Sequence, residues 1–224
     1  MTFKNREDAG RQLVAELLQH RDNPRGLILA LPRGGVAVGY QLSLALHLPL
    51  DVFITRKIGA PDNPEYAIGA VTETGSRYLN QEAVRSFGLS RHELERLIHV
   101  QENEIARRKN LYRQGRLLPQ LIGRTVLLVD DGIATGSTFM ASALAIRSLQ
   151  PHRLVGAIPV GPSSTIREVR AHVDELVVLM TPNPFEAVGS FFVDFTQVED
   201  RDVAEYLNLA EEAMLERAPS SPAS

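Results

Sequence analysis

The chain has 224 residues, of which 44% are hydrophobic and 23% charged, a composition typical of a globular protein that excludes disorder as the main state. Its 24 Lys and Arg against 27 Asp and Glu give a formal net charge of −3, without the basic excess of nucleic-acid-binding proteins. The absence of Cys excludes disulfides, thiolate metal sites and cysteine nucleophiles.

The N-terminus does not have the pattern of a targeting segment. Lys4, Arg6, Glu7 and Asp8 stand where a signal peptide would have its apolar core. No later stretch approaches the roughly 18 to 20 uninterrupted apolar residues of a membrane span. We therefore expect a cytoplasmic protein that binds neither a membrane nor nucleic acid.

The first part of the chain alternates helical and extended patterns. Residues 5–20 have apolar side chains at helical spacing and predict an amphipathic helix. The apolar run at 26–31 predicts a strand, and residues 36–47 resume a helical pattern after a glycine turn. A second apolar run at 50–55 predicts another strand. The loop composition of residues 59–66, with Gly, Pro, Asp and Asn, excludes a helix there.

The middle of the chain is polar. Short strands at 67–72 and 77–79 are expected to pair. Residues 81–116 have a helical pattern with an incomplete apolar stripe, and we interpret them as a helical insertion over the sheet edge. Its charge-rich part, residues 91–116, is either a solvated helix face or a dimer contact.

Regular alternation follows in the C-terminal half. Strands are predicted at 125–129, 154–160 and 175–180, and helices at 138–149, 163–171 and 200–217. Strands that alternate with helices predict a parallel sheet covered on both faces, with ligands at the carboxyl ends of the strands. The fold class is therefore α/β, with a three-layer, mostly parallel central sheet. Residues 218–224 have the composition of a disordered tail.

The strongest motif is the run Val-Leu-Leu-Val-Asp-Asp-Gly-Ile-Ala-Thr-Gly-Ser-Thr at 126–138. An apolar strand brings Asp130 and Asp131 to its carboxyl end, and a loop of small and hydroxylated residues leads into a helix. Such a loop offers backbone N–H groups, hydroxyls and the positive end of a helix dipole to a phosphate. A ribose 5-phosphate fits both features, with its phosphate in the loop and its hydroxyls on the two carboxylates. The alternative is an acid pair that caps a structural turn.

This run resembles the 5-phosphoribosyl 1-diphosphate signature of the type I phosphoribosyltransferases over all its thirteen positions. The resemblance implies one domain over 1–217, with a helical insertion or lid region at 73–118 and a base-binding hood at 181–199. It assigns catalytic roles to Asp130, Asp131, Arg33 and Lys57. It assigns the 5-phosphate to the loop residues Ala134, Thr135, Gly136, Ser137 and Thr138.

Two further motifs resemble the diphosphate site of this family. Arg33-Gly34-Gly35 is similar to the diphosphate loop, which in relatives contains a non-proline cis peptide, expected here between Arg33 and Gly34. Arg56-Lys57 resembles the basic pair of the adenine-type enzymes, and residues 59–66 resemble their mobile lid. Taken alone, the first motif is a common turn and the second an exposed basic pair.

The segment 185–195 resembles the hood of the purine enzymes. The resemblance assigns the base to Phe191, Phe192 and Val193, and a Mg²⁺ ligand role to Asp194. One residue more than in the hypoxanthine type separates Val188-Gly189 from Asp194. Core aromatic residues and a surface aspartate are the alternative.

The resemblance implies an enzyme that transfers ribose 5-phosphate from phosphoribosyl diphosphate to a nitrogenous base, a purine rather than a pyrimidine. It implies diphosphate release, Mg²⁺, a role in nucleotide salvage and a homodimer. Ala134 replaces the aspartate of the 6-oxopurine enzymes, which argues against hypoxanthine or guanine. The lid acid of the adenine type has no match, since Gly69 stands near its place, so the acceptor stays open.

Two other classes are compatible with the motifs. A non-catalytic phosphoribosyl diphosphate or nucleotide sensor on the same fold would keep the loop at 130–138. An unrelated phosphatase or response-regulator-like protein would use Asp130 as phosphoacceptor. The six His have no ligand spacing, which argues against a zinc site.

Overall fold

The computed structural model describes residues 2–217, apart from the side chains at 64 and 65. The tail predicted at 218–224 lies outside the described residues. Among residues 2–217, none of the helices combines the length and the apolar composition that a bilayer crossing requires.

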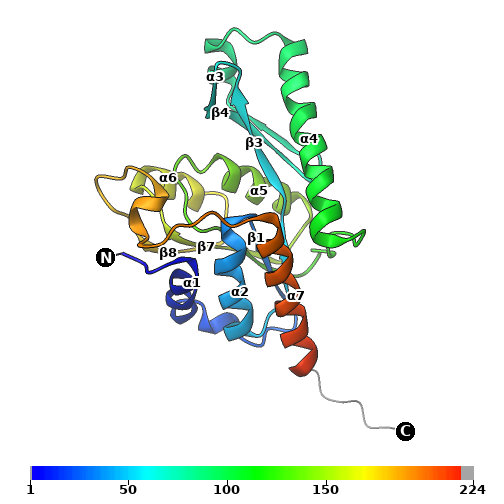
Figure 1. The fold of residues 1–224 in the computed structure, drawn as a ribbon, viewed down its shortest axis with the longest axis vertical. Helices are drawn as coiled ribbons and strands as arrows, with labels where there is room; N and C mark the ends of the chain where they lie inside the picture. The colour runs from blue at the N-terminus through cyan, green and yellow to red at the C-terminus, as the bar shows by residue number, and fades with distance from the viewer. Residues whose placement is uncertain (1, 218–224) are drawn as a thin grey trace.

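The main sheet has five parallel strands in the order β2-β1-β6-β7-β8. Their bounds are β1 Gly26–Ala30, β2 Leu50–Val52, β6 Thr125–Val129, β7 Arg153–Val160 and β8 Glu175–Met180. Every residue of β1 and β6 is buried, because helices cover both faces of the sheet (Figure 1). The predicted three-layer α/β fold is confirmed.

The two faces of the sheet carry separate apolar cores. On one face, α1 (Arg6–Ala15) and α2 (Gly34–Leu46) pack on Leu127 and Val129 of β6. On the other, α5 (Ser137–Ser148) and α6 (Ser163–Arg170) pack on the alternate β6 residues, Val126 and Leu128. The period of two along a strand thus divides one apolar run between two helical layers. The last helix, α7 (Asp200–Arg217), packs against α2.

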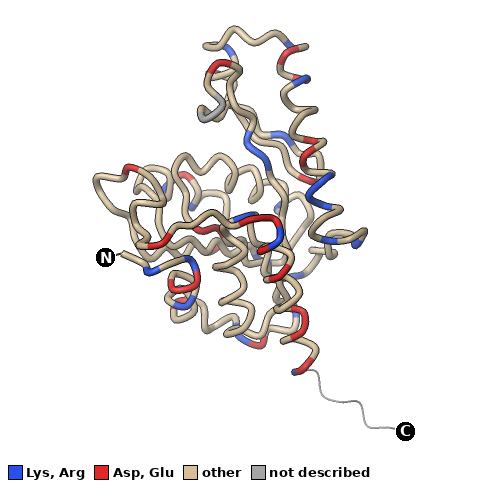
Figure 2. The backbone as a smooth tube through the Cα atoms, viewed as in Figure 1, with Lys and Arg blue, Asp and Glu red and all other residues tan. Residues whose placement is uncertain are grey.

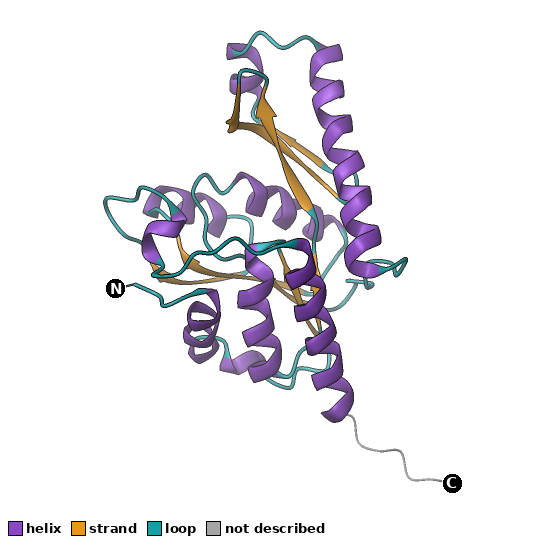
Figure 3. Ribbon diagram, viewed as in Figure 1, coloured by secondary structure: helices purple, strands orange, loops and turns teal. Residues whose placement is uncertain are grey.

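A second lobe extends from the main sheet (Figure 3). It comprises the antiparallel strands β3 (Thr55–Ala60), β4 (Asn63–Thr72) and β5 (Arg77–Leu79) and the helices α3 (Gln81–Ser86) and α4 (Arg91–Arg113). Its small core includes Ile58, Ile68 and Ile98. Ser90 begins α4 with a capping box to Glu93.

Three expectations for this region need correction. The run predicted as one strand at 50–55 is divided between two sheets, since β2 ends at Val52 and β3 begins at Thr55. Most of the predicted loop at 59–66 is paired strand, and register shifts at Ile58, Gly59 and Ala60 accommodate the glycine. The helical insertion packs along β3 and β4 and against α7, rather than over an edge of the main sheet. The expected pairing of 67–72 with 77–79 is confirmed.

A buried ion-pair network joins the second lobe to the main sheet. Arg113, the last residue of α4, is 2% exposed, and its Nε lies 3.0 Å from Oδ1 of Asp51. It also donates to the Glu73 carboxylate and to the Val52 carbonyl. The Glu73 carboxylate accepts in turn from the Ile54 N–H at 2.8 Å. Burial raises the pKa of Asp51, and Arg113 opposes that shift.

Candidate functional site

Residues 132–138, the phosphate-type loop, connect β6 to the first turn of α5 at the carboxyl edge of the main sheet. Gly136 precedes α5 with a left-handed φ of +71°, and a Cβ there would lie 2.6 Å from Cγ2 of Thr165. The Thr165 hydroxyl donates to the Ala134 carbonyl at 2.8 Å, so α6 holds the loop from behind. Thr135 is exposed, and its hydroxyl lies 3.3 Å from that of Ser137. The loop therefore presents hydroxyls and a helix N-terminus outward.

The acid pair lies at the start of this loop. The backbone N–H of Asp131 donates to Oδ1 of Asp130 at 2.9 Å. Burial, followed by the charge of Asp131, raises the pKa of Asp130 well above its usual range. Asp131 forms an ion pair with Arg6, whose Nε lies 2.6 Å from its Oδ2.

The Arg33-Gly34-Gly35 segment meets the acid pair, because β1 and β6 are neighbours in the sheet. A Cβ on Gly34 would lie 1.9 Å from Oδ2 of Asp131, and one on Gly35 would lie 2.8 Å from the Val129 carbonyl oxygen. Only glycine fits this close approach. The non-proline cis peptide joins Pro32 and Arg33, so the expected position between Arg33 and Gly34 is wrong by one bond.

The predicted basic residues come from two places in the fold: Arg33 lies directly before α2, and Arg56 and Lys57 lie on β3. Nη1 of Arg33 lies 3.8 Å from Oδ1 of Asp200, and Nε of Arg56 donates to Oε1 of Gln101 at 3.1 Å. Burial lowers the pKa of Arg56, and the charges of Arg108 and Arg33 lower it further. Arg56 and Lys57 both line a cavity of about 330 Å³ between β3 and α4. Figure 2 shows the basic positions on β3 and on the C-terminal half of α4.

Two carboxylates form ion pairs with members of the arginine cluster, which comprises Arg33, Arg56, Arg107 and Arg108. Glu104 accepts from Arg107 and Arg108, and these hydrogen bonds lower its pKa to about 2 despite partial burial. Asp200 accepts from Tyr112 and Arg107. Burial raises the pKa of Asp200, but the two hydrogen bonds outweigh burial and leave it below its usual value. The cluster stays ionised at neutral pH.

The hood segment packs against the loop directly after the acid pair. Its short helix η2 (Val188–Phe191) places Val188 against the loop, since a Cβ on Gly132 would lie 2.4 Å from Cγ1 of Val188. Phe192 is buried, and its ring centroid lies 5.2 Å from that of Phe3 and 4.9 Å from that of Phe195.

The other predicted hood residues are more accessible. Phe191 is half-buried and stacks on Phe185 at 5.4 Å, whereas Val193 is 80% exposed. Asp194 is exposed, and its Oδ1 accepts from the Thr196 hydroxyl at 2.6 Å and the Thr196 N–H at 2.9 Å, which lowers the pKa of Asp194.

The acid pair can contribute ligands to a metal ion. Within residues 2–217, no three or more His, Asp or Glu side chains form a metal-binding group. Mg²⁺ is usually held by one or two carboxylates, with substrate phosphates and water as its other ligands. Adjacent carboxylates beside a phosphate-type loop fit that donor set.

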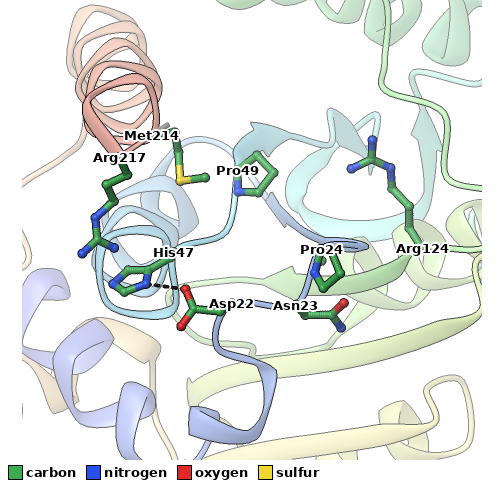
Figure 4. A pocket seen from close by; sticks show the side chains of 9 residues that line it. Asp22, Asn23, Pro24, His47, Pro49, Arg124, Met214 and Arg217 are labelled. Atoms are coloured by element: carbon green, nitrogen blue, oxygen red, sulfur yellow. Dashed lines mark hydrogen bonds and ion pairs between the residues drawn. The ribbon is translucent and has the colours of Figure 1, made fainter. Parts of the chain in front are cut away.

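A larger cavity, of about 620 Å³, has a different set of lining residues, which Figure 4 shows. It is lined by Pro24, Pro49 and Arg124, next to the amino ends of β1, β2 and β6, and by Arg217 at the end of α7. None of the residues predicted from the sequence as site residues lines it. It lies at the edge of the sheet opposite Asp130.

Sequence reasoning missed several residues that shape the site. Arg6 pairs with Asp131, Thr165 supports the phosphate-type loop, and Arg108 extends the arginine cluster. Only Arg6 carries a local signal: a cation in the first turn of a helix opposes the helix dipole, which suggests a partner elsewhere.

Comparison with known proteins points to one family. A family model described as the phosphoribosyl transferase domain matches residues 2–190. Two curated proteins, from two strains of Mycobacterium tuberculosis and named provisionally as phosphoribosyl transferases, are each 40% identical over 208 residues. The match covers 93% of this chain and 47% of each relative, so the chain spans about half their length. A Thermus thermophilus protein of known crystal structure shares 38% of its sequence with this chain. The two structures superpose with a TM-score of 0.77 over 92% of this chain and 98% of that one.

Proposed function

We propose that this chain, which belongs to the phosphoribosyl transferase family, transfers ribose 5-phosphate from phosphoribosyl diphosphate to a nitrogenous base and releases diphosphate. The observation that carries the proposal is the meeting of Gly34 and Asp131 at the carboxyl edge of β1 and β6. It brings a diphosphate-type loop, an acid pair and a phosphate-type loop to one place. A sugar that carries two phosphate groups and free hydroxyls fits this combination.

Each part of the donor substrate has a candidate partner. The 5-phosphate would bind the loop residues Ala134, Thr135, Gly136, Ser137 and Thr138, at the N-terminus of α5. The ribose hydroxyls would bind Asp130 and Asp131. The diphosphate would bind Arg33, Gly34, Gly35, Arg56 and Lys57.

The reaction breaks the bond between C1 of the ribose and the diphosphate oxygen and forms a bond from C1 to a base nitrogen. Negative charge builds on the leaving diphosphate, so guanidiniums fixed in advance stabilise the transition state more than the ground state. Asp130 and Asp131 hold the ribose while C1 moves, and neither is a nucleophile. They would also hold Mg²⁺ together with substrate oxygens, with Asp194 as a further candidate ligand, and the ion would supply charge neutralisation for the diphosphate.

The hood would provide the base site, with a purine as the favoured acceptor. Phe191 and Val193 are the more accessible of the three predicted base contacts, and Phe192 supports them from the core. A flat purine ring buries more surface against such side chains than a pyrimidine does. Ala134 leaves no carboxylate in the loop for the proton of a 6-oxopurine.

Calorimetric titration of phosphoribosyl diphosphate with Mg²⁺ tests this proposal. A screen for diphosphate release over purine and pyrimidine bases should follow directly. We expect metal-dependent binding and turnover with one base. Binding without turnover on any base would favour the non-catalytic sensor, and no binding would contradict the proposal.

A further inference from the structure

Arg6 connects three parts of the site that are far apart in the sequence. Its side chain is 10% exposed, and Nε lies 2.6 Å from Oδ2 of Asp131. Nη1 donates to the Thr196 carbonyl at 2.8 Å, and the guanidinium carbon lies 3.8 Å from the centroid of the Phe195 ring. A Cβ on Gly34 would lie 2.8 Å from Nε, so the diphosphate-type loop also touches this side chain.

The stability of α1 does not explain this placement. Arg6 lies in the first turn of α1, where a positive charge opposes the helix dipole, whereas Glu7 and Asp8 in the same turn complement it. Removing a guanidinium from water is costly unless an opposite charge and hydrogen-bond acceptors replace the water. Those replacements come from Asp131 and Thr196, which belong to the acid pair and the hood. The acid pair and the hood, rather than α1, therefore stabilise Arg6 in its buried position.

The hood is also tied to the chain directly before Arg6. The N–H groups of Val193 and Asp194 donate to the carbonyls of Phe3 and Lys4, each at 2.9 Å. The Phe3 N–H donates to the Phe191 carbonyl at the same distance. A displacement of Arg6 would therefore reach both the acid pair and the hood.

We propose that Arg6 is a positioning residue that fixes the Asp131 carboxylate for the ribose hydroxyl and holds the hood against the phosphate-type loop. It engages Oδ2 of Asp131 and leaves Oδ1 outside the ion pair. The ribose part of this inference rests on the proposed function, whereas the hood part does not.

The test compares Arg6→Gln with Arg11→Gln. Arg11 lies on the same helix, is exposed, and is 4.0 Å from Asp8 in a weak pair, so it is a matched control. We expect Arg6→Gln to raise the Kd for phosphoribosyl diphosphate with Mg²⁺ about 10- to 100-fold, in line with losing a charged hydrogen bond to a buried group. Arg11→Gln should leave the Kd unchanged. A folded Arg6→Gln protein with the wild-type Kd would overturn the positioning role.

A double-mutant cycle with Asp131→Asn separates positioning from general destabilisation. If Arg6 acts through Asp131, Arg6→Gln should raise the Kd much less in the Asp131→Asn background. Arg6→Lys should recover only part of the affinity, because an ammonium cannot reproduce the planar fork that reaches both Asp131 and Thr196. Penalties that multiply fully in the double variant would show that Arg6 acts independently of Asp131.

Hydrogen exchange provides a readout that needs no ligand. In Arg6→Gln the amides of residues 189–196 should exchange faster, while those of β6 and β7 stay unchanged. Unchanged exchange in the hood would contradict the inference. The two proposals can fail separately. If the wild-type protein does not bind phosphoribosyl diphosphate but Arg6→Gln still speeds exchange in the hood, the proposed function is refuted and the role of Arg6 in holding the hood is supported.

Discussion

At the scale of single residues, the Asp130 carboxyl combines a cost in stability with a proposed role in binding. It is half-buried beside a second acid, and desolvation and the neighbouring charge both raise its pKa. Because the folded pKa lies above the unfolded value, its contribution to stability is fully present below the unfolded pKa. That contribution is lost as the pH rises through the folded pKa. At neutral pH the ionised form of Asp130 therefore destabilises the folded state.

Asp130→Asn should raise the free energy of unfolding at pH 7 by about 0.5–2 kcal/mol, and the gain should shrink as the pH falls toward the unfolded pKa. The same variant should weaken the binding of phosphoribosyl diphosphate. Urea denaturation at several pH values, combined with calorimetric titration, checks both effects.

Asp174→Asn is the control for Asp130→Asn, because a hydrogen bond from Arg147 lowers the pKa of Asp174. The contribution of Asp174 is present above its unfolded pKa and lost as the pH falls through the folded pKa, so its variant should not be stabilised at pH 7. Stabilisation of both variants would contradict the interpretation of Asp130.

Thr135 offers a cleaner test of the phosphate-type loop, because its side chain is exposed. Thr135→Ala should change the free energy of unfolding by less than about 0.5 kcal/mol. If the hydroxyl binds the 5-phosphate, the variant should lose about 1–2 kcal/mol of binding energy for phosphoribosyl diphosphate, or about tenfold in Kd. Thermal unfolding and calorimetry measure the two quantities separately, and equal losses in both would refute the assignment.

At the scale of elements, α4 is joined to the main sheet by the ion pairs of Arg113. Arg113→Met leaves the buried Glu73 carboxylate and the half-buried Asp51 carboxylate without their cation, and should cost about 3–5 kcal/mol of stability. Arg116→Met is the control, since Arg116 pairs with Glu211 in an exposed ion pair and should cost less than about 1 kcal/mol. Equal denaturation midpoints for the two variants would contradict the role assigned to Arg113.

The elements that the sequence predicts well are those determined by local pattern. The run from Val126 to Thr138 predicts strand, loop and helix because apolar residues, acids and small residues follow one another in the order that the fold uses them. The division at 52–55 could not be predicted, because the apolar run is continuous there. At the change of sheet the Ile54 N–H donates to Glu73, which lies nineteen positions away and is not indicated by the local pattern.

The candidate site shows the same limit. Gly59 and Pro61 predict a loop, but pairing with β4 stabilises a strand through Ala60. Arg6 and Asp131 are 125 positions apart, and no pattern in a single sequence connects them. The sequence indicated the chemistry of the site residues, whereas their neighbours became visible only in the folded structure.

At the scale of the whole molecule, the two lobes should differ in local stability. The strands β1 and β6 are entirely buried, whereas β5 is short and α4 has one face in solvent. Hydrogen exchange should therefore be slowest in β1 and β6 and faster in the second lobe.

Phosphoribosyl diphosphate with Mg²⁺ should slow exchange at residues 132–138 and in the hood. Protection confined to the cavity beside Pro24 and Arg124 would instead place the ligand at the opposite edge of the sheet. The homodimer stays a prediction, which sedimentation measurements check.

Because α4 is long, a small rotation at one of its ends would produce a large displacement at the other. Its 23 residues extend about 34 Å at a rise of about 1.5 Å per residue, and Arg113 fixes one end. A rotation of about 10° at Arg113 would carry the Ser90 end through an arc of about 6 Å. Arg107 and Arg108 lie close to the pivot, so a small adjustment of these side chains around a bound anion is amplified at the far tip. A small movement of α4 at the arginine cluster would therefore become a larger displacement of the second lobe, which contains β3, β4 and α3.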